Sequence, residues 1–151
     1  MRFKKKKSSI KNVIFGKNVT VIEPVNLYNC EISDNCFIGP FVEIQSEAYI
    51  GKNTRVQSHS FICSKVKIGN NCFIGHGVVF TNDKFTKNKI ERNKKNLLKT
   101  RVGDNVLIGS NSTILPVEIE DHVIVGAGSV VTKKCSSKKI YFGNPAKKKN
   151  R

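Results

Sequence analysis

The stretch "ISDNCFIGPFVEIQSEAYIGKNTRVQSHSFICSKVKIGNNCFIGHGVVF", residues 32 to 80, repeats one pattern every six residues. A large apolar residue opens each hexad, and a small or β-branched residue follows four positions later in nearly every one. A period of six fits neither an amphipathic helix nor an alternating strand. It predicts short strands joined by regular corners, with one large and one small inward side chain per side. The opening residues are Ile32, Ile38, Ile44, Ile50, Val56, Ile62, Ile68, Ile74 and Phe80.

Asparagine residues at the corners indicate how many sides one coil has. Asn35, Asn53 and Asn71 are spaced by 18 residues, which corresponds to three sides of six residues. Asn18 and Asn105 take the same place in flanking coils. Asparagine tolerates the left-handed backbone conformation that a sharp corner needs. We therefore expect triangular coils with a ladder of asparagines along one edge.

The pattern extends over most of the chain and predicts a single domain. It resumes at Val102 after a lysine- and asparagine-rich interruption, and two shortened spacings, Leu27 to Ile32 and Ile114 to Ile119, fall on the same side of the coil. The expected organisation of residues 1–151 is a basic N-terminal segment (1–12), first coils (13–80), an inserted active-site loop (81–101), later coils (102–136), and a C-terminal strand with a basic tail (137–151).

The charge and the cysteines limit the partners and the compartment. A formal net charge of +16 requires that nucleic acid and anionic membranes be considered. No nucleic-acid-binding motif accompanies the charge, so we interpret it as lysine-rich codon usage together with attraction for phosphorylated small ligands. No apolar segment is long enough to span a bilayer. Five cysteines without a C-x-x-C pair predict reduced thiols in a cytoplasmic protein without a zinc or redox motif.

Stacking the coils places one set of residues in a file. If the interruption is an insertion within one hexad, Ile38, Val56, Ile74, Ile108 and Val125 open the same side of successive coils. Coils are spaced by about 4.8 Å, and the glycines at 75, 109 and 126 would leave a shallow groove below His76. The long loop would then close a site at the head of this groove. The file itself is Pro40, Ser58, His76, Ser110 and Ala127.

Tandem hexads of the form [IV]-G-x-x-[small]-x resemble those of the hexapeptide-repeat acyltransferases. The segments "GHGVVFTNDKF", "IGSNSTILP", "VGAGSVVTK" and "GNPAK" are most similar to the branch that acetylates the 3-amino group of nucleotide-linked amino sugars. The resemblance implies an all-β fold, a left-handed parallel β-helix. It further implies an acetyl-CoA-dependent N-acetyltransferase that modifies a UDP- or dTDP-linked amino sugar for cell-surface glycans such as lipopolysaccharide. A cytoplasmic homotrimer without a metal is expected, with acetyl-CoA bound between two subunits.

Candidate site residues follow from the file, the loop and the resemblance. Asn82, the asparagine of the FTN segment, would orient the sugar amine, because an amide oxygen accepts a hydrogen bond. His76 would assist proton removal, and the Ser110 N–H would stabilise the oxyanion. The expected substrate contacts are Gln57, Ser58, His59, Asp83 and Arg92. The expected acetyl-CoA contacts are Gly109, Ser110, Gly126 and Ala127, and, from the resemblance, Asn144, Pro145, Ala146, Lys147 and Lys148.

Other readings of the same residues stay open. His76 and His59 also suit exposed corners, and His122 takes a corner place that asparagine holds in other coils. O-acetylation of a sugar or serine hydroxyl would make His76 an essential base. A scaffold that binds nucleic acid is disfavoured by the intact groove. A zinc-dependent carbonic anhydrase of the same fold is disfavoured because an H-x-x-x-x-H pair is absent.

Overall fold

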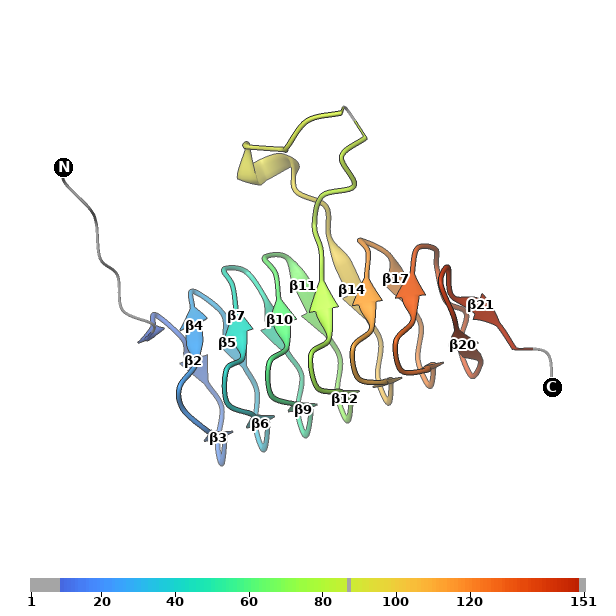
Figure 1. Cartoon of the computed structure of the whole chain (residues 1–151). Coiled ribbons are helices and arrows are strands. Elements are labelled where there is room, and N and C mark those ends of the chain that lie inside the picture. Colours follow the sequence, from blue (N-terminus) through green and yellow to red (C-terminus); the bar gives the residue numbers. More distant parts are fainter. Residues whose placement is uncertain (1–8, 87, 150–151) are drawn as a thin grey trace.

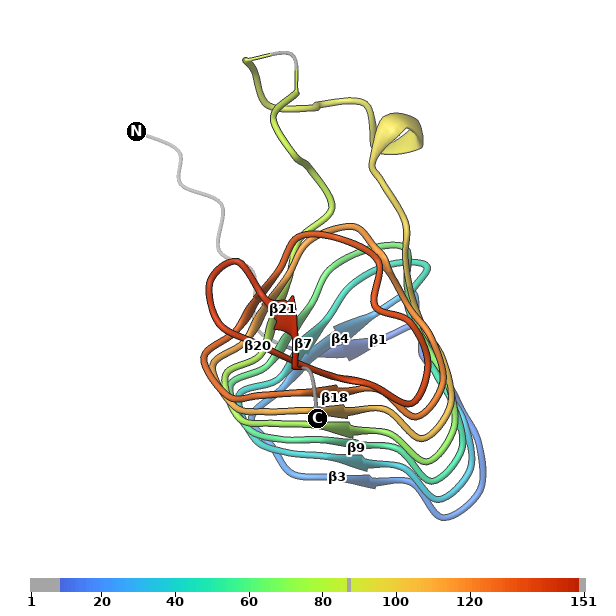
Figure 2. The same cartoon turned by 90° about the vertical axis from the view of Figure 1, so that its right-hand side faces the viewer.

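A computed structural model describes residues 9–86 and 88–149, and their body is a solenoid of short strands in three sheets (Figures 1 and 2). Consecutive strands lie in different sheets, and each strand pairs in parallel with the strand one coil away. The first sheet, sheet A, contains β1 (Ile10–Lys11), β4 (Asn26–Tyr28), β7 (Glu43–Ile44), β10 (Phe61–Ile62), β13 (Val79–Phe80), β16 (Thr113–Ile114) and β19 (Val130–Val131).

The other two sheets complete the triangle. Sheet B contains β2 (Ile14–Phe15), β5 (Glu31–Ile32), β8 (Tyr49–Ile50), β11 (Val66–Ile68), β14 (Thr100–Val102) and β17 (Glu118–Ile119). Sheet C contains β3 (Thr20–Val21), β6 (Phe37–Ile38), β9 (Arg55–Val56), β12 (Phe73–Ile74), β15 (Leu107–Ile108), β18 (Ile124–Val125), β20 (Ile140–Phe142) and the antiparallel β21 (Lys147–Lys148). We name the three edges AB, BC and CA after the sheets that they join.

The large residue of each hexad forms the core, as the period of six predicts. Ile38, Val56, Ile74 and Ile108 are completely buried and pair in register along sheet C. The small residues fill the corners, and Thr54 donates its hydroxyl to the Gly69 carbonyl at 2.9 Å. Burial of aliphatic side chains on all three sides is the main stabilising contribution to such a solenoid.

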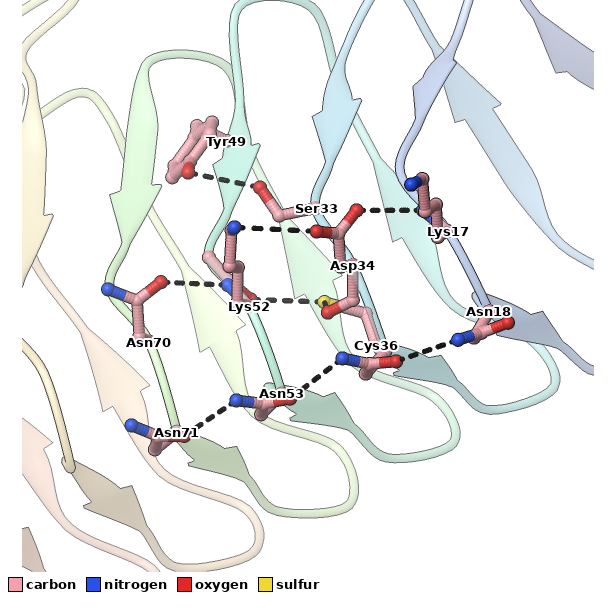
Figure 3. A network of polar contacts seen from close by, with 12 residues as sticks. Lys17, Asn18, Ser33, Asp34, Cys36, Tyr49, Lys52, Asn53, Asn70 and Asn71 are labelled. Atoms are coloured by element: carbon pink, nitrogen blue, oxygen red, sulfur yellow. Dashed lines mark hydrogen bonds and ion pairs between the residues drawn. The ribbon is translucent and has the colours of Figure 1, made fainter.

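Edge BC carries the predicted asparagine ladder (Figure 3). The Nδ2 of Asn18 donates to the Oδ1 of Asn35 at 3.2 Å, Asn35 donates to Asn53 at 3.2 Å, and Asn53 donates to Asn71 at 3.0 Å. All four residues have φ values of 54° to 56°, in the left-handed region. His122 has a φ of 59° at the same edge, which confirms its interpretation as a corner residue.

The solenoid begins earlier and ends differently from the predicted boundaries. Strand β1 starts at Ile10, inside the segment expected to precede the coils, and β14 starts at Thr100, inside the segment expected to be loop. Strand β20 confirms the expected C-terminal strand, and β21 then folds back onto it. The basic residues 1–8 and the end of the tail, 150–151, lie outside the described residues.

The insertion leaves the body at edge AB, between β13 and β14, and stands away from the three sheets (Figures 1 and 2). It contains the short 3-10 turn η1 (Lys94–Asn96). The two five-residue spacings lie at the same edge, between β4 and β5 and between β16 and β17. In residues 9–86 and 88–149, the short turn η1 is the helical element. No helix in these residues is long and apolar enough to cross a membrane.

All five cysteines are buried and unpaired. Desolvation raises the pKa of the Cys63 thiol to about 12 and that of the Cys30 thiol to about 11. Because thiolate is the reactive form, we expect the native protein to react with a thiol reagent at pH 7.5 at least about a hundredfold more slowly than the unfolded chain. The measurement is stopped-flow thiol titration with and without denaturant. One native thiol reacting at the unfolded rate would contradict it.

Candidate active site

The predicted file of residues runs along edge CA. Strands β6, β9, β12, β15 and β18 pair in the expected register, which confirms the order Pro40, Ser58, His76, Ser110 and Ala127. Cross-coil backbone bonds fix it, with the Gly77 N–H donating to the Ser58 carbonyl at 3.0 Å and the Gly128 N–H to the Ser110 carbonyl at 2.8 Å. The file is therefore a continuous row of corner residues from one coil to the next.

His76 is held by its backbone, and its side chain is exposed. The His76 N–H donates to the Ser110 Oγ at 3.2 Å, and the His76 carbonyl accepts from the Asn111 N–H at 2.8 Å. These two bonds fix the corner. The imidazole is therefore free to meet a ligand or a second chain.

On edge BC, four of the N–H groups at the corresponding position are occupied by side chains from the next coil (Figure 3). The acceptor is an asparagine or aspartate Oδ1 at 2.7–2.9 Å in each case. Such local side-chain acceptors satisfy donors that corner geometry leaves without a strand partner. The pairs, donor first, are Lys17 with Asp34, Lys52 with Asn70, Asn70 with Asp104, and Asp104 with Asp121.

On edge CA, three of these N–H groups are left open. Within the described residues, none of the Ser58, Ser110 and Ala127 N–H groups donates to a protein acceptor, and the last two lie in adjacent coils. Ala127 stands where Asp121 stands on edge BC, and its methyl group cannot accept a hydrogen bond. Two backbone donors, one coil apart and about 4.8 Å from each other, are thus available to a ligand along this edge.

The C-terminal tail extends the same edge. Gly143 donates its N–H to the Ser129 Oγ at 3.2 Å, and Ala146 donates its N–H to the Val130 carbonyl at 2.8 Å. These bonds place the GNPA segment next to the Ala127 coil, where the file predicts it. Lys147 and Lys148 are exposed in β21, so their ammonium groups can reach anionic groups of a ligand.

The glycines of the file have a different role from the one the sequence suggested. A Cβ on Gly75 would lie 2.6 Å from the Ser110 nitrogen, and a Cβ on Gly109 would lie 2.4 Å from the Ala127 nitrogen. Gly51 and Gly69, on edge BC, are equally tight against the next coil. These glycines let the coils approach, so their presence alone does not mark a groove. Within the described residues, the open Asp34 and Asp121 N–H groups of edge BC lie in coils far apart, so two open N–H groups in adjacent coils, those of Ser110 and Ala127, distinguish edge CA from edge BC.

Asn82 lies at edge AB, at the opposite end of β13 from His76. A full side of the coil separates the two residues, and six steps of about 3.3 Å per residue span at most about 20 Å. The expectation that the loop adjoins the head of the His76 file is therefore wrong for one chain, because a six-residue step leads to another edge. The Asn82 Nδ2 donates to the Ser64 Oγ at 3.0 Å, which leaves its Oδ1 free to accept.

The loop is organised by its own polar groups. Asp83 accepts from the Phe85 N–H and from the Glu91 N–H, both at 2.8 Å. The Glu91 bond and then the Phe85 bond hold the pKa of the Asp83 carboxyl below its usual value. Asp83 is thus engaged inside the loop, and Arg92 is exposed on it. A hollow of about 190 Å3 next to Asp83 is lined by Asn82, Thr86, Lys89, Glu91, Asn96 and Leu98.

A larger hollow lies on sheet B and not at His76. It has a volume of about 660 Å3 and lies near the base of the loop, with Lys65, Lys67, Lys99 and Arg101 in its lining. Lys65 donates to the carbonyls of Lys95 and Leu97, at 3.0 and 3.3 Å, and so ties η1 to the body. This hollow on sheet B lies across the body from the file of residues that contains His76. We therefore place the candidate active site on edge CA, where the Ser110 and Ala127 N–H groups are open.

The remaining predicted substrate residues lie one coil before His76. Gln57, Ser58 and His59 occupy edge CA, and the ring of His59 stacks on that of Phe41, with centroids 4.7 Å apart and planes 17° apart. Phe41 was missed by the sequence prediction. The signal for it was a bulky aromatic residue at a corner position, where other coils have histidine, glycine or asparagine.

No metal centre can be assigned from the described ranges, where no three histidine, cysteine or acidic side chains gather closely enough to hold an ion. His76, His59 and His122 are divided between edges CA and BC. The three histidines therefore do not converge.

Two family models match the chain. One is described as the hexapeptide repeat of succinyl-transferase and matches residues 65–80 and 99–133; the other is the bacterial transferase hexapeptide of six repeats and matches residues 29–64. Together they span more than half of the chain and interrupt only at the inserted loop. The chain belongs to the hexapeptide-repeat family, and its parallel solenoid is consistent with the left-handed β-helix of that family. No curated protein sequence matches it significantly.

Solved structures with this fold include several acetyltransferases. A mutant of perosamine N-acetyltransferase from Caulobacter crescentus, in complex with CoA and GDP-perosamine, has a TM-score of 0.66 at 18% identity and covers 95% of this chain. This chain spans 58% of that protein. A maltose O-acetyltransferase from Clostridium difficile has a TM-score of 0.62 at 22% identity, and the match covers 94% of this chain and 70% of that protein. Soybean serine acetyltransferase has a TM-score of 0.60 at 32% identity, and the match covers 71% of this chain and 42% of that protein.

Proposed function

We propose that this chain is an acetyl-CoA-dependent N-acetyltransferase that acts on the 3-amino group of a UDP- or dTDP-linked amino sugar, for cell-surface glycan biosynthesis. The observation that carries the proposal is the row of open donors on edge CA between His76 and the GNPA segment. The pantetheine arm of coenzyme A carries amide carbonyls, and the acetyl thioester carries another carbonyl. Hydrogen-bond donors in a row suit such an extended ligand. The complex of the perosamine enzyme with CoA and a nucleotide sugar supports the ligand class.

The chemistry uses the position of each donor. The Ser110 N–H lies one coil from His76 and would donate to the thioester oxygen as negative charge develops in the tetrahedral intermediate. The Ala127 N–H would hold a pantetheine carbonyl one coil further along. The exposed lysines of β21 would meet the phosphates at the far end of coenzyme A.

The acceptor amine attacks the thioester carbon, and the leaving sulfur is expelled as the tetrahedral intermediate collapses. Part of a sugar amine is already neutral near pH 7, so orientation matters more than strong base catalysis. The free Oδ1 of Asn82 would accept a hydrogen bond from the amine and so aim its lone pair. His76 would take the proton that the new amide nitrogen loses.

A homotrimer fits this division of roles, because Asn82 and His76 lie on different edges of one chain. The outward-facing side chains of sheet C support a contact between two copies of the chain next to edge CA.

On sheet C, the outward residues Phe73, Leu107 and Ile124 pair in successive coils and are 36%, 44% and 40% exposed. On sheet B, the corresponding row is polar, with Lys67 and Arg101 side by side. An apolar face between copies is typical of homo-oligomers. We therefore propose that sheet C is covered by a second copy, whose loop brings Asn82 to this His76.

O-acetylation of a sugar hydroxyl is the second candidate. His76 is an exposed imidazole at the head of the open donors, which is where a base for a hydroxyl would be needed. The maltose and serine enzymes with this fold show that the scaffold supports such acceptors. In that case His76 carries the reaction, and Asn82 is dispensable.

The test uses the purified chain, acetyl-CoA and a panel of UDP- and dTDP-linked amino sugars, each matched with the same sugar carrying a hydroxyl in place of the amine. We expect acetyl transfer to the amine, followed by mass spectrometry, and a trimer mass by light scattering at micromolar concentration. Transfer to the hydroxyl analogues alone would assign the second candidate. A monomer that transfers acetyl groups at the full rate would contradict the two-chain site.

A further inference from the structure

The stacked pair of Phe41 and His59 is an exposed aromatic surface on edge CA. The two residues occupy the same corner in neighbouring coils, and their parallel rings have centroids 4.7 Å apart. The Phe41 N–H donates to the Pro24 carbonyl at 2.6 Å, and the His59 N–H donates to the Pro40 carbonyl at 3.1 Å. Both backbones are thus fixed by cross-coil bonds, and the rings are displayed from a rigid edge.

Folding alone does not explain the choice of phenylalanine. Phe41 has a φ of 60°, a left-handed conformation that is costly for a bulky residue and easy for asparagine. Asn111 has a φ of 58° at the same edge. The ring is also 57% exposed, so it gains little from burial, whereas Phe80 is completely buried in the core. A strained, exposed aromatic ring next to a candidate site suggests a role in ligand binding.

The position of the pair relative to His76 suggests which ligand it meets. The open Ser110 and Ala127 donors lie on the C-terminal side of His76 along edge CA. On its N-terminal side, His59 lies one coil away and Phe41 lies two coils away. If coenzyme A occupies the C-terminal side, the acceptor approaches from the N-terminal side. Two coils amount to about 10 Å, a distance that a sugar ring and a diphosphate bridge.

We propose that the Phe41–His59 pair is the binding platform for the nucleobase of the acceptor. This inference rests on the proposed function, since it assumes that coenzyme A and the acceptor lie on opposite sides of His76. A flat, exposed ring binds any nucleobase by stacking, because every base has a π face. The phosphates and the sugar would then extend along edge CA towards His76.

The test replaces Phe41 by asparagine, the residue that this corner geometry favours. Phe41→Asn removes the ring and relieves the strained conformation, so the melting temperature stays equal or rises. We expect the affinity for UDP and dTDP, measured by isothermal titration calorimetry, to fall about tenfold. The KM for the nucleotide sugar rises to a similar extent with kcat unchanged, and the affinity for coenzyme A is unaltered.

Glu47→Asn is the matched control, because Glu47 has a φ of 64° on edge AB and gains the same relief of strain. It should leave nucleotide affinity unchanged. Equal nucleotide affinity in wild type and Phe41→Asn would overturn the inference, as would loss of the trimer in Phe41→Asn, which would assign the pair to a subunit contact. Wild type that binds UDP through Phe41 but acetylates no amino sugar would uphold this platform and reject the proposed function. Binding of neither UDP nor dTDP by wild type would overturn the platform.

Discussion

Ala127→Asp is expected to abolish coenzyme A binding while leaving the fold intact. The new carboxylate would stand where Asp121 stands on edge BC and would accept the Ser110 N–H as Asp121 accepts the Asp104 N–H at 2.9 Å. The donor proposed for the thioester would be occupied, and a negative charge would face the phosphate-bearing ligand. A hydrogen bond contributes about 1–3 kcal/mol when its partner is left unsatisfied, so we expect affinity to fall at least about a hundredfold. Calorimetric titration of the wild type and of Ala127→Asp with coenzyme A measures this affinity.

The matched control removes an acceptor from the other edge. Asp121→Ala opens the Asp104 N–H on edge BC and should lower the free energy of unfolding by about 1 kcal/mol without changing coenzyme A affinity. Denaturant unfolding of both variants separates stability from binding. Unchanged coenzyme A affinity in Ala127→Asp would place the cofactor elsewhere and remove the main support for the candidate site.

Asn82→Ala is expected to reduce kcat/KM for the amino sugar by about a hundredfold or more, because it removes the acceptor that aims the amine in the reactive geometry. His76→Ala is expected to cost less, about tenfold at pH 7.5, and to flatten the acidic limb of the pH profile, since the group that takes the proton is removed. Steady-state kinetics across pH 6 to 9 give both values. The opposite ranking would indicate a hydroxyl acceptor that must be deprotonated.

Mixed trimers separate a one-chain site from a two-chain site. If Asn82 and His76 come from different chains, co-expression of His76→Ala with Asn82→Ala rebuilds intact sites in mixed trimers. Random assembly then recovers about a quarter of the wild-type rate, which is about 2.5-fold above His76→Ala alone and at least about 25-fold above Asn82→Ala alone. If both residues served from the same chain, no mixed trimer would contain an intact site, and the rate would stay at the level of the single variants.

The coil geometry could be predicted from the sequence because the inward position that opens each hexad is occupied by an apolar residue, which the sequence shows directly. Ile38, Val56 and Ile74 occur at a fixed spacing, and that spacing has one solution once the corner asparagines set three sides per coil. The file containing His76 and Ser110 followed directly, because the register of a solenoid depends only on counting. The inserted loop did not disturb this count, since it adds residues at a corner.

The state of the corner hydrogen bonds could not be predicted in the same way. Whether the Ser110 N–H is open depends on the side chain one coil later, which is a relation between Ser110 and Ala127 that periodicity does not reveal. The glycine at 75 was interpreted as space for a ligand, although it makes space for the next coil. The separation of Asn82 from His76 was also underestimated, because a short distance in sequence is a whole side of the triangle.

Edge AB differs from the other two edges in how many residues it uses. Leu27 to Ile32 and Ile114 to Ile119 take one residue fewer than a full hexad there, and Phe80 to Val102 takes many more, yet the pairing of sheets B and C continues without a shift. Length changes are thus confined to one edge, while edge CA keeps a constant spacing. A lineage of such proteins can exchange the segment that contributes Asn82, and with it the choice of acceptor, without rebuilding the row that holds the acyl donor. For protein engineering, the interval 81–99 is the place to graft foreign loops.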